Sequence, residues 1–452
     1  MIRLAARKGR LRRRRQVTAS GIDWDKATRE ATDLLCRYIT VNTANPPGNE
    51  LAGVRFLTQV LRENGIDSET YPVDAQRANM SARLPGDGSK RPLVLLNHID
   101  VVPAEREFWQ EDPFAGAVKD GVIWGRGALD MKSMAVMELM TLLLLRRQGL
   151  PLKRDILFLA CADEEQGGVA GIDWLDAHHP ELFDAEYVIN EGGYGSTEMF
   201  GVRRPVFSCS VGEKGPLWLR LVAHGMPGHG SVPHPDNCLE RLVRALYKVQ
   251  TWRRPITLLP EVATMLERLK SASIFGEEVS EQGLTGVAES NPLLRAFLTD
   301  TVSTTMCNAG VKSNVIPAVA EATLDCRLLP GHDPAAFIEQ VKQVIDDPRV
   351  EVQQVMESHT PISPVGTELF NVIDAVSRET APHAIVIPSI ATGFTDSRVF
   401  RRRGVTAYGF VPCLLEPAEV ATVHGNDERI PVEKLGLGLR MLYEVVRRMC
   451  VE

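Results

Sequence analysis

The stretch PLVLLNHID, residues 92–100, decides the fold of this chain. Its opening residues are apolar and polar residues follow at once, which is the pattern of a short strand buried on both faces of a largely parallel sheet. Ligand-binding groups gather just beyond the carboxyl ends of such strands. His98 and Asp100 occupy that position. The stretch therefore predicts an α/β domain with a site at the carboxyl edge of its sheet.

The sequence around this strand alternates between helical and extended patterns, as expected of an α/β domain. Amphipathic segments precede the strand, and helical and strand-like segments follow it in turn. The predicted helices cover residues 24–39, 51–64, 132–148 and 171–178, and the further predicted strands cover residues 155–162 and 187–190. We expect a mixed central sheet flanked by helices.

A second type of sequence begins near Gly212, where residues 217–223 alternate between apolar and polar side chains. The segments that follow have the order strand, helix, strand, strand, helix, strand, which predicts a small α+β sandwich. They cover residues 217–223, 239–250, 304–329 (an extended pair), 334–345 and 350–356. Residues 251–300 do not fit this order and are interpreted as an insertion. The α/β pattern returns after Ser363, so the second domain is predicted to be inserted into the first.

The predicted division is therefore a basic, disordered tail (1–20), a first catalytic part (21–212), an inserted domain that we call the lid (213–359) and a second catalytic part (360–452). The formal net charge is -7, but residues 1–15 hold eight basic and no acidic residues, so the rest of the chain carries -15. An acidic body repels phosphate backbones, and no apolar run reaches the ~20 residues of a membrane span. We expect neither a nucleic-acid nor a membrane partner.

Cysteine usage indicates the cellular compartment. The eight cysteines are spread along the chain without a C-x-x-C pair. They are interpreted as free thiols in a reducing compartment, not as a disulfide framework or a thiolate metal site. A cytoplasmic location is the resulting expectation.

Two motifs in the first half bring a histidine and a carboxylate to strand ends and loops. Side chains two apart on a strand share a face, so His98 can bind a metal while Asp100 accepts the hydrogen bond that fixes its tautomer. Asp130 follows a loop with glycines at 125 and 127 and precedes a predicted helix. Taken alone, each motif favours the simpler interpretation, which is a surface histidine for His98 and a helix cap for Asp130.

Further carboxylates follow the next two strands. Adjacent acids such as Glu164 and Glu165 repel one another unless cations offset their charge, and they point in different directions, so one can bind a metal while the other acts as a base. Glu191 lies at a strand tip beside glycines, and His424 lies in the segment VHGNDE. This mixed nitrogen and oxygen set without thiolates favours a pair of Zn²⁺ or similar ions. A solvated acidic turn is the alternative for residues 163–165.

The order of these motifs resembles that of the M20 family of metallopeptidases and deacylases, over about residues 39–431 and including the segment VNTANPPGNE at 41–50. The resemblance implies a zinc-exopeptidase-like catalytic domain and a ferredoxin-like lid. It also implies that His98 and Glu191 hold one ion, that Glu165 and His424 hold the other, and that Asp130 bridges them. Asp100 would orient His98, and Glu164 would be the general base.

The resemblance extends into the lid. His229, in the segment GHGS at 228–231, matches a family histidine that reaches the active site of a neighbouring subunit, which implies a homodimer. Asn314 and Arg327 match positions that bind the substrate carbonyl and carboxylate. Gly393 begins a substrate-lining loop in which Phe394 replaces a second glycine. The residues alone do not distinguish His229 from its neighbours His224 and His234.

These features predict hydrolysis of an amide bond next to a free carboxylate by two Zn²⁺, with Co²⁺ or Mn²⁺ as substitutes. Glu191 favours an N-acyl-amino acid substrate, because aspartate at that position is more usual in the peptide-cleaving members. A dipeptidase or carboxypeptidase is the alternative, and an inactive metal-binding scaffold is an alternative of another class. The apolar residues of the insertion either line a pocket for an apolar acyl chain or pack in the core of an enlarged lid; they are Ile256, Leu258, Leu259, Met265 and Leu266.

Overall fold

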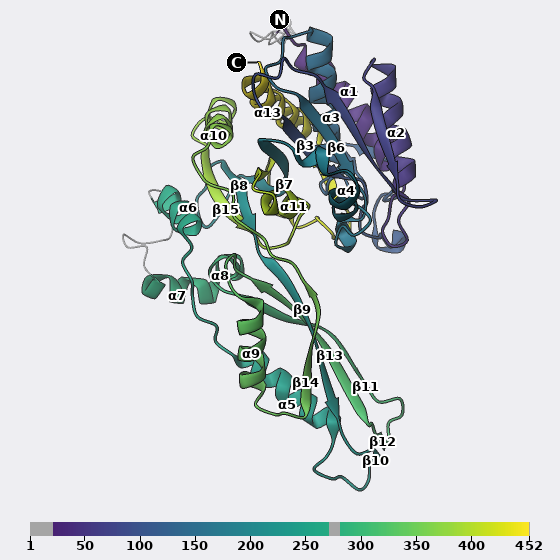
Figure 1. Cartoon of the computed structure of the whole chain (residues 1–452), viewed down its shortest axis with the longest axis vertical. Helices are drawn as coiled ribbons and strands as arrows, with labels where there is room; N and C mark the ends of the chain where they lie inside the picture. The colour runs from purple at the N-terminus through teal and green to yellow at the C-terminus, as the bar shows by residue number, and fades with distance from the viewer. Residues whose placement is uncertain (1–20, 271–280, 452) are drawn as a thin grey trace, which may run out of the picture.

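A computed structural model describes residues 21–270 and 281–451. Figure 1 shows a broad upper part, built of a sheet and its helices, and a narrow part that extends away from it. The basic tail, residues 1–20, lies outside the described residues, so its predicted disorder stays a prediction. No helix among the described residues is both long enough and apolar enough to cross a membrane.

The upper part contains an eight-stranded sheet in the order β1-β2-β6-β3-β7-β16-β8-β15. β3 runs parallel to β6 and β7, whereas β2 runs antiparallel to β1 and β6. The predicted mixed α/β class is therefore confirmed. The strands are β1 (Ser68–Pro72), β2 (Ala78–Leu84), β3 (Leu93–His98), β6 (Ile156–Cys161), β7 (Tyr187–Ser196), β8 (Val206–Glu213), β15 (Ile385–Ala391) and β16 (Thr406–Leu415).

The central strands are buried because helices cover both faces of the sheet. Leu93 and Leu95 of β3 pack into the core with α3, while Val94 and Leu96 pack on the opposite face with α4 and α11. This alternation follows from the two-residue period of a strand. The helices of this part are α1 (Trp24–Ile39), α2 (Glu50–Glu63), α3 (Lys132–Gln148), α4 (Ile172–His178), α10 (Glu368–Thr380), α11 (Ser397–Arg402) and α13 (Val432–Cys450).

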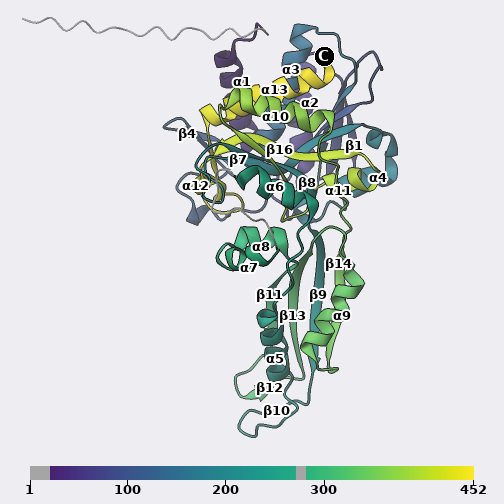
Figure 2. The same cartoon turned by 90° about the vertical axis from the view of Figure 1, so that its left-hand side faces the viewer.

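The narrow part is a four-stranded antiparallel sheet in the order β11-β13-β9-β14, with α5 and α9 packed on it. Figure 2 shows β11 and β14 at its two edges. The small pair β10 and β12 lies at the far tip (Figure 1). The elements are β9 (Gly215–His224), β10 (Gly228–His229), α5 (Cys238–Thr251), β11 (Thr301–Ala309), β12 (Val315–Ile316), β13 (Val319–Leu328), α9 (Pro334–Ile345) and β14 (Val350–Glu357).

The insertion between α5 and β11 forms three helices, α6 (Pro260–Lys270), α7 (Glu281–Ser290) and α8 (Pro292–Leu298). Met265 and Leu266 are buried in the main core, and residues 256, 258 and 259 pack against it. These five apolar residues therefore pack in a core, but it is the core of the upper part and not that of an enlarged lid. Residues 271–280 of the insertion lie outside the described part of the chain.

A three-stranded sheet joins the two halves of the upper part. It has the order β17-β5-β4, with β4 (Ala117–Lys119), β5 (Val122–Trp124) and β17 (Arg429–Pro431). Because β17 pairs with β5, the segment that contains His424 lies beside the glycine loop that leads to Asp130. Residues 300 positions apart are thus brought to one site.

Candidate metal centre

The predicted ligands converge at the carboxyl edge of the main sheet. His98 ends β3, Glu191 lies in β7, and Glu165 lies in the turn η2 (Glu164–Gln166) after β6. Asp130 and His424 come from the loops beside β5 and β17. The structure brings these residues together in two groups that are able to hold an ion, one of His98, Asp130 and Glu191 and the other of Asp130, Glu165 and His424.

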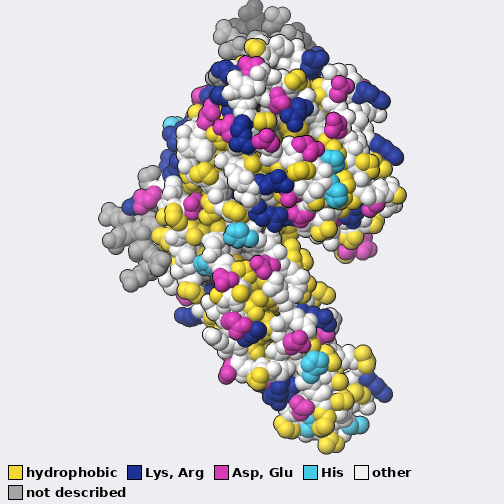
Figure 3. Space-filling view, in the orientation of Figure 1, with side chains coloured by type: hydrophobic (Ala, Val, Ile, Leu, Met, Phe, Trp, Pro, Cys, Tyr) yellow, Lys and Arg dark blue, Asp and Glu magenta, His cyan; other side chains and the backbone are white. Residues whose placement is uncertain are grey.

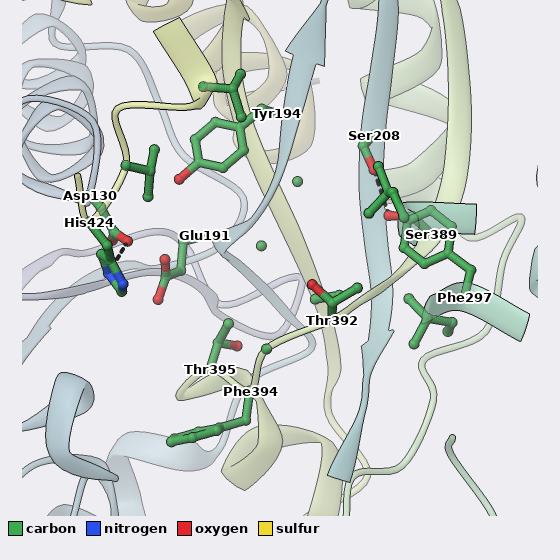
Figure 4. Close-up of a pocket in the computed structure, with 18 of the residues that line it drawn as sticks. Asp130, Glu191, Tyr194, Ser208, Phe297, Ser389, Thr392, Phe394, Thr395 and His424 are labelled. Atoms are coloured by element: carbon green, nitrogen blue, oxygen red, sulfur yellow. Dashed lines mark hydrogen bonds and ion pairs between the residues drawn. The ribbon is translucent and has the colours of Figure 1, made fainter. Parts of the chain in front are cut away.

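Asp130 belongs to both groups because its two oxygens face different histidines. Oδ1 lies 3.1 Å from Nε2 of His98, and Oδ2 lies 3.1 Å from Nε2 of His424. Nε2 of His98 is also 3.6 Å from Glu191, and Nε2 of His424 is 3.2 Å from Glu165. Figure 4 shows Asp130, Glu191 and His424 around one end of a pocket. Asp130 does not cap α3, whose N-cap is Met131.

The electrostatics of the centre show an excess of buried negative charge. Burial and repulsion by Glu191 hold the pKa of Glu164 well above its ordinary value, and burial and repulsion by Asp130 do the same for Glu191. Hydrogen bonds with Asp130 and Glu165 raise the pKa of His424 to about 10. Bound cations would offset this charge. Two imidazoles and three carboxylates without thiolates are a donor set that fits a pair of divalent ions such as Zn²⁺.

Asp100 lies beside His98, the residue that it was predicted to orient. Nδ1 of His98 lies 2.9 Å from the backbone carbonyl of Asp100 but 3.6 Å from its carboxylate. The carboxylate is the more distant of the two groups because β3 ends at His98. The side chains of His98 and Asp100 therefore do not share one face of a strand. The carboxylate instead accepts hydrogen bonds from the amides of Glu164 and Glu165 and from the side chain of Asn45. Asp100 thus fixes the turn that presents these two glutamates.

Asp163 anchors the same turn from the other side. Its backbone has a positive φ of 67°, an uncommon conformation outside glycine, so the turn depends on side-chain anchors. The carboxylate accepts hydrogen bonds from the Asn45 amide and the amide of Ala170, and it pairs with the Arg77 guanidinium. Sequence reasoning missed Arg77, which follows no local motif.

Glu428 is a second residue that sequence reasoning missed, although it was part of the quoted VHGNDE segment. It is fully buried, and its carboxylate accepts hydrogen bonds from the backbone amides of Gly127, Leu129 and Asp130. Its second oxygen lies 2.6 Å from the Arg126 guanidinium. Glu428 therefore fixes the loop that carries the shared ligand Asp130.

A pocket of about 970 Å³ opens beside the two ion groups. Glu164 and Glu165 line it at one end, and Figure 4 shows it passing Tyr194 and Thr392 toward Phe297 of α8. The walls away from the ion groups are largely apolar. They include Tyr194, Met199, Phe200, Leu293, Phe297, Ile390, Val420 and Val423.

The predicted substrate residues fall into two places. Arg327 and Gly393 line the pocket, and Phe394 places its ring 5.4 Å from the Arg327 guanidinium. His229 and Asn314 instead lie together at the tip of the narrow part, where Gly230 donates to the Asn314 carbonyl. Figure 1 shows this tip, marked by β10 and β12, far from β3 and β7, the strands that carry His98 and Glu191.

Arg327 is oriented toward the pocket by an acid behind it. Asp325 receives two hydrogen bonds from Arg327, of 2.7 and 3.1 Å, and a third from Trp218. The remaining nitrogen, Nη1, is buried and has no hydrogen-bond partner among the described residues. This nitrogen is available to an anionic group of a ligand.

Known proteins share this architecture. The sequence matches the model of peptidase family M20/M25/M40 over residues 94–448. It is 32% identical over 388 residues to the N-fatty-acyl-amino acid synthase/hydrolase PM20D1 of Mus musculus, which covers 80% of this chain and 75% of that protein. It is 29% identical over 406 residues to aminoacylase-1 of Sus scrofa, with 88% and 89% covered.

Among solved structures, an M20 family metallo-carboxypeptidase, Sso-CP2 from Sulfolobus solfataricus, superposes with a TM-score of 0.73 at 18% identity. The match covers 92% of this chain and 98% of that chain. At this identity the likeness concerns the fold.

Proposed function

The chain belongs to peptidase family M20/M25/M40, and from that premise we propose that it hydrolyses N-acyl-amino acids with an apolar acyl group. It is a hydrolase of a metal-dependent family that acts on amide bonds. The observation that carries the substrate proposal is the large, mostly apolar pocket that begins at the ion groups and ends at Phe297. A pocket of this shape and lining suits a long aliphatic chain better than a second polar residue.

We propose two Zn²⁺ ions as the cofactors, with His98 and Glu191 holding one, Glu165 and His424 holding the other, and Asp130 shared between them. When bound, such ions lower the pKa of water and polarise a carbonyl oxygen. The arrangement of the five side chains in two overlapping groups supports this assignment.

Glu164 is proposed as the general base. It lies in the pocket lining next to the ligand Glu165, and it belongs to neither ion group. A carboxylate at this position takes a proton from the attacking water and returns it to the leaving amine. Its turn is fixed by Asp100, so the group is positioned before substrate binds.

Arg327 is proposed to bind the carboxylate of the amino-acid product. Its unpartnered Nη1 and its fixed orientation by Asp325 support this role, since a charged hydrogen bond selects amides that carry a nearby acid. Gly393 would allow the substrate backbone to approach, and Phe394 would cover the face of Arg327.

A second copy of the chain is proposed to supply His229 and Asn314, because both lie beside the β10 and β12 pair at the tip of the narrow part, which Figure 1 shows far from β3 and β7 of the same chain. The homodimer would form along β11, an edge strand whose outer residues are exposed, and along the neighbouring helix α5. Met306, Val243 and Tyr247 are exposed apolar side chains on these two elements. A cytoplasmic location, expected from the cysteine pattern, stays a prediction.

The test is amine release from a panel of N-acyl-amino acids, from acetyl to oleoyl, together with matched dipeptides. We expect cleavage of the long-chain substrates, loss with a chelator and recovery with Zn²⁺. A preference for dipeptides would show a peptidase instead. Two bound metals with no cleavage on the whole panel would refute the substrate proposal and keep the metal centre.

A further inference from the structure

A second cavity, of about 360 Å³, lies at the other end of the strands that reach the metal centre. It is lined by Arg204, Arg268, Arg378 and His383, with Ala384 and Ile385. Ile385 begins β15, while Ser389 to Ala391 at the end of that strand line the pocket with the ion groups. Figure 1 shows α6, α10 and β15 gathered on this side of the molecule.

The cavity has more positive than negative charge. Arg268 of α6 and Arg378 of α10 share one acid, Asp374, at distances of 3.8 and 3.0 Å. Arg268 also donates to the carbonyl of Val386. Two guanidiniums on one carboxylate leave an uncompensated charge, which is notable in a chain whose body is acidic.

Arg204 is the third cation, and its side chain has no hydrogen-bond acceptor in the part of the chain that the structure describes. Its Nε atom is buried without a hydrogen-bond partner, and within residues 21–270 and 281–451 it forms no ion pair. A partly buried guanidinium loses hydration without gaining a partner, which is costly unless an anion completes the site. The backbone around it is fixed, because Ile385 donates to the carbonyl of the next residue, Pro205.

We propose that this cavity binds a phosphate group. Three guanidiniums against one carboxylate leave an excess of two positive charges, which matches a phosphate dianion, and guanidinium groups pair with phosphate through two parallel hydrogen bonds. His383, exposed at the rim, supplies a further donor when protonated. The volume leaves room for a small organic group beyond the phosphate.

The experiment is a calorimetric titration of the metal-loaded protein with inorganic phosphate. Because phosphate also binds divalent cations, the comparison is between variants. Arg204→Gln is expected to weaken one binding event by about tenfold or more, the usual effect of losing a charged hydrogen bond. The matched control is Arg203→Gln, which changes an exposed neighbour outside the cavity that pairs with Glu198. It should leave that event unchanged.

Melting curves show whether each variant is folded. Arg204→Gln should be at least as stable as the parent without phosphate, since it removes an unpaired cation, and it should lose the stabilisation that phosphate gives the parent. Identical isotherms for the parent and Arg204→Gln overturn the proposal. The proposal is also overturned if no phosphate-binding event of the parent is weakened by Arg204→Gln.

The source of the phosphate group is decided by a second arm. Vesicles of phosphatidylcholine with phosphatidic acid are sedimented with the parent and with Arg204→Gln. Sedimentation of the parent alone identifies a lipid headgroup as the ligand. Phosphate binding without sedimentation identifies a soluble phosphate ester.

Discussion

At the scale of single residues, Glu164 has the most direct chemical role that we assign. Glu164→Gln keeps the shape of the side chain and removes its basicity. We expect kcat to fall by about 10²–10⁴-fold, the usual contribution of a general base. Metal content measured by atomic absorption should stay that of the parent, because Glu164 belongs to neither ion group. Activity close to that of the parent would show that another group takes the proton.

Glu50 makes stability depend on pH. Burial raises its pKa to about 7 from 4.5, and neither of its oxygens has a hydrogen-bond partner among the described residues. The folded protein therefore binds this proton more tightly than the unfolded chain, and the free energy of unfolding falls as pH rises from about 4.5 to about 7.

Glu50→Gln removes this titration. We expect it to raise the melting temperature relative to the parent at pH 8 and to change it much less at pH 4.5. Thermal unfolding at the two pH values measures the difference. Glu63→Gln, an exposed change at the end of the same helix, is the control, and an equal effect of Glu50→Gln at both pH values would contradict the prediction.

The residue scale also shows what sequence reasoning reaches. The five predicted ligands lie near the ends of apolar runs or beside glycines in a recognisable order, so they are predictable as a set; they are His98, Asp130, Glu165, Glu191 and His424. Arg77 and Glu428 are not, because each acts on a segment far away along the chain. The hydrogen bonds of Asp100 with the amides of Glu164 and Glu165 were not predictable either, because they join it to a distant turn.

At the scale of elements, α8 closes the pocket end that lies away from the ion groups. Phe297→Ala should shift the substrate preference to longer acyl chains. Each added methylene then gains about fourfold in kcat/KM, since burying one contributes about 0.8 kcal/mol. Leu294→Ala, buried on the same helix but outside the pocket lining, should leave the preference unchanged. The measurement is kcat/KM against chain length, and an unmoved profile for Phe297→Ala would remove α8 from the substrate site.

The two edges of the lid sheet allow a matched test of the dimer. Met306 on β11 and Val355 on β14 are 58% and 59% exposed, respectively. A lysine on an edge strand opposes pairing with another strand. Met306→Lys is therefore expected to yield monomers in light scattering and to lower activity at least tenfold, by loss of a charged hydrogen bond from the partner's lid. Val355→Lys should remain dimeric, and a dimeric Met306→Lys protein would exclude β11 as the interface.

The boundaries of several helices were predictable from the sequence. α1, α3 and α9 begin and end at the predicted residues, because amphipathic or apolar periodicity and clear end signals coincide there. The insertion was not predictable as three helices. Its helix α6 packs against β15, and this contact has no signature in the local sequence.

At the scale of the whole molecule, a site shared between two chains permits complementation. His229→Ala and Glu164→Gln should each be nearly inactive. When they are unfolded together and refolded, mixed dimers contain one intact site, and we expect about a quarter of the parent activity from statistical mixing of a two-fold assembly. The assay is amine release before and after mixing. No recovery, with mixed dimers shown by tagged pull-down, would place His229 outside the partner's site.

The overall architecture was predictable as a mixed sheet with an inserted α+β unit. The α/β pattern of the sequence stops near Gly212 and returns after Ser363, and these two positions mark the ends of the lid. The distance between the tip of the lid and the ion groups was not predictable. That distance depends on the lengths of β9 and β13 and on the direction in which they leave the main sheet (Figure 2). On the face in Figure 3, Lys and Arg side chains are interspersed with Asp and Glu, without a continuous basic surface.

The pairing of β17 with β5, and of Glu428 with the Asp130 loop, has a consequence for how the protein is made. During translation, His98 and Asp130 are synthesised early, but His424 and α13 are synthesised only after the entire lid. The apolar surface of α3 that α13 covers therefore stays uncovered until then, since α13 packs on α3 and β16. The five proposed ligands are all present only after residue 424 has been synthesised, so the proposed metal loading must follow the synthesis of the lid.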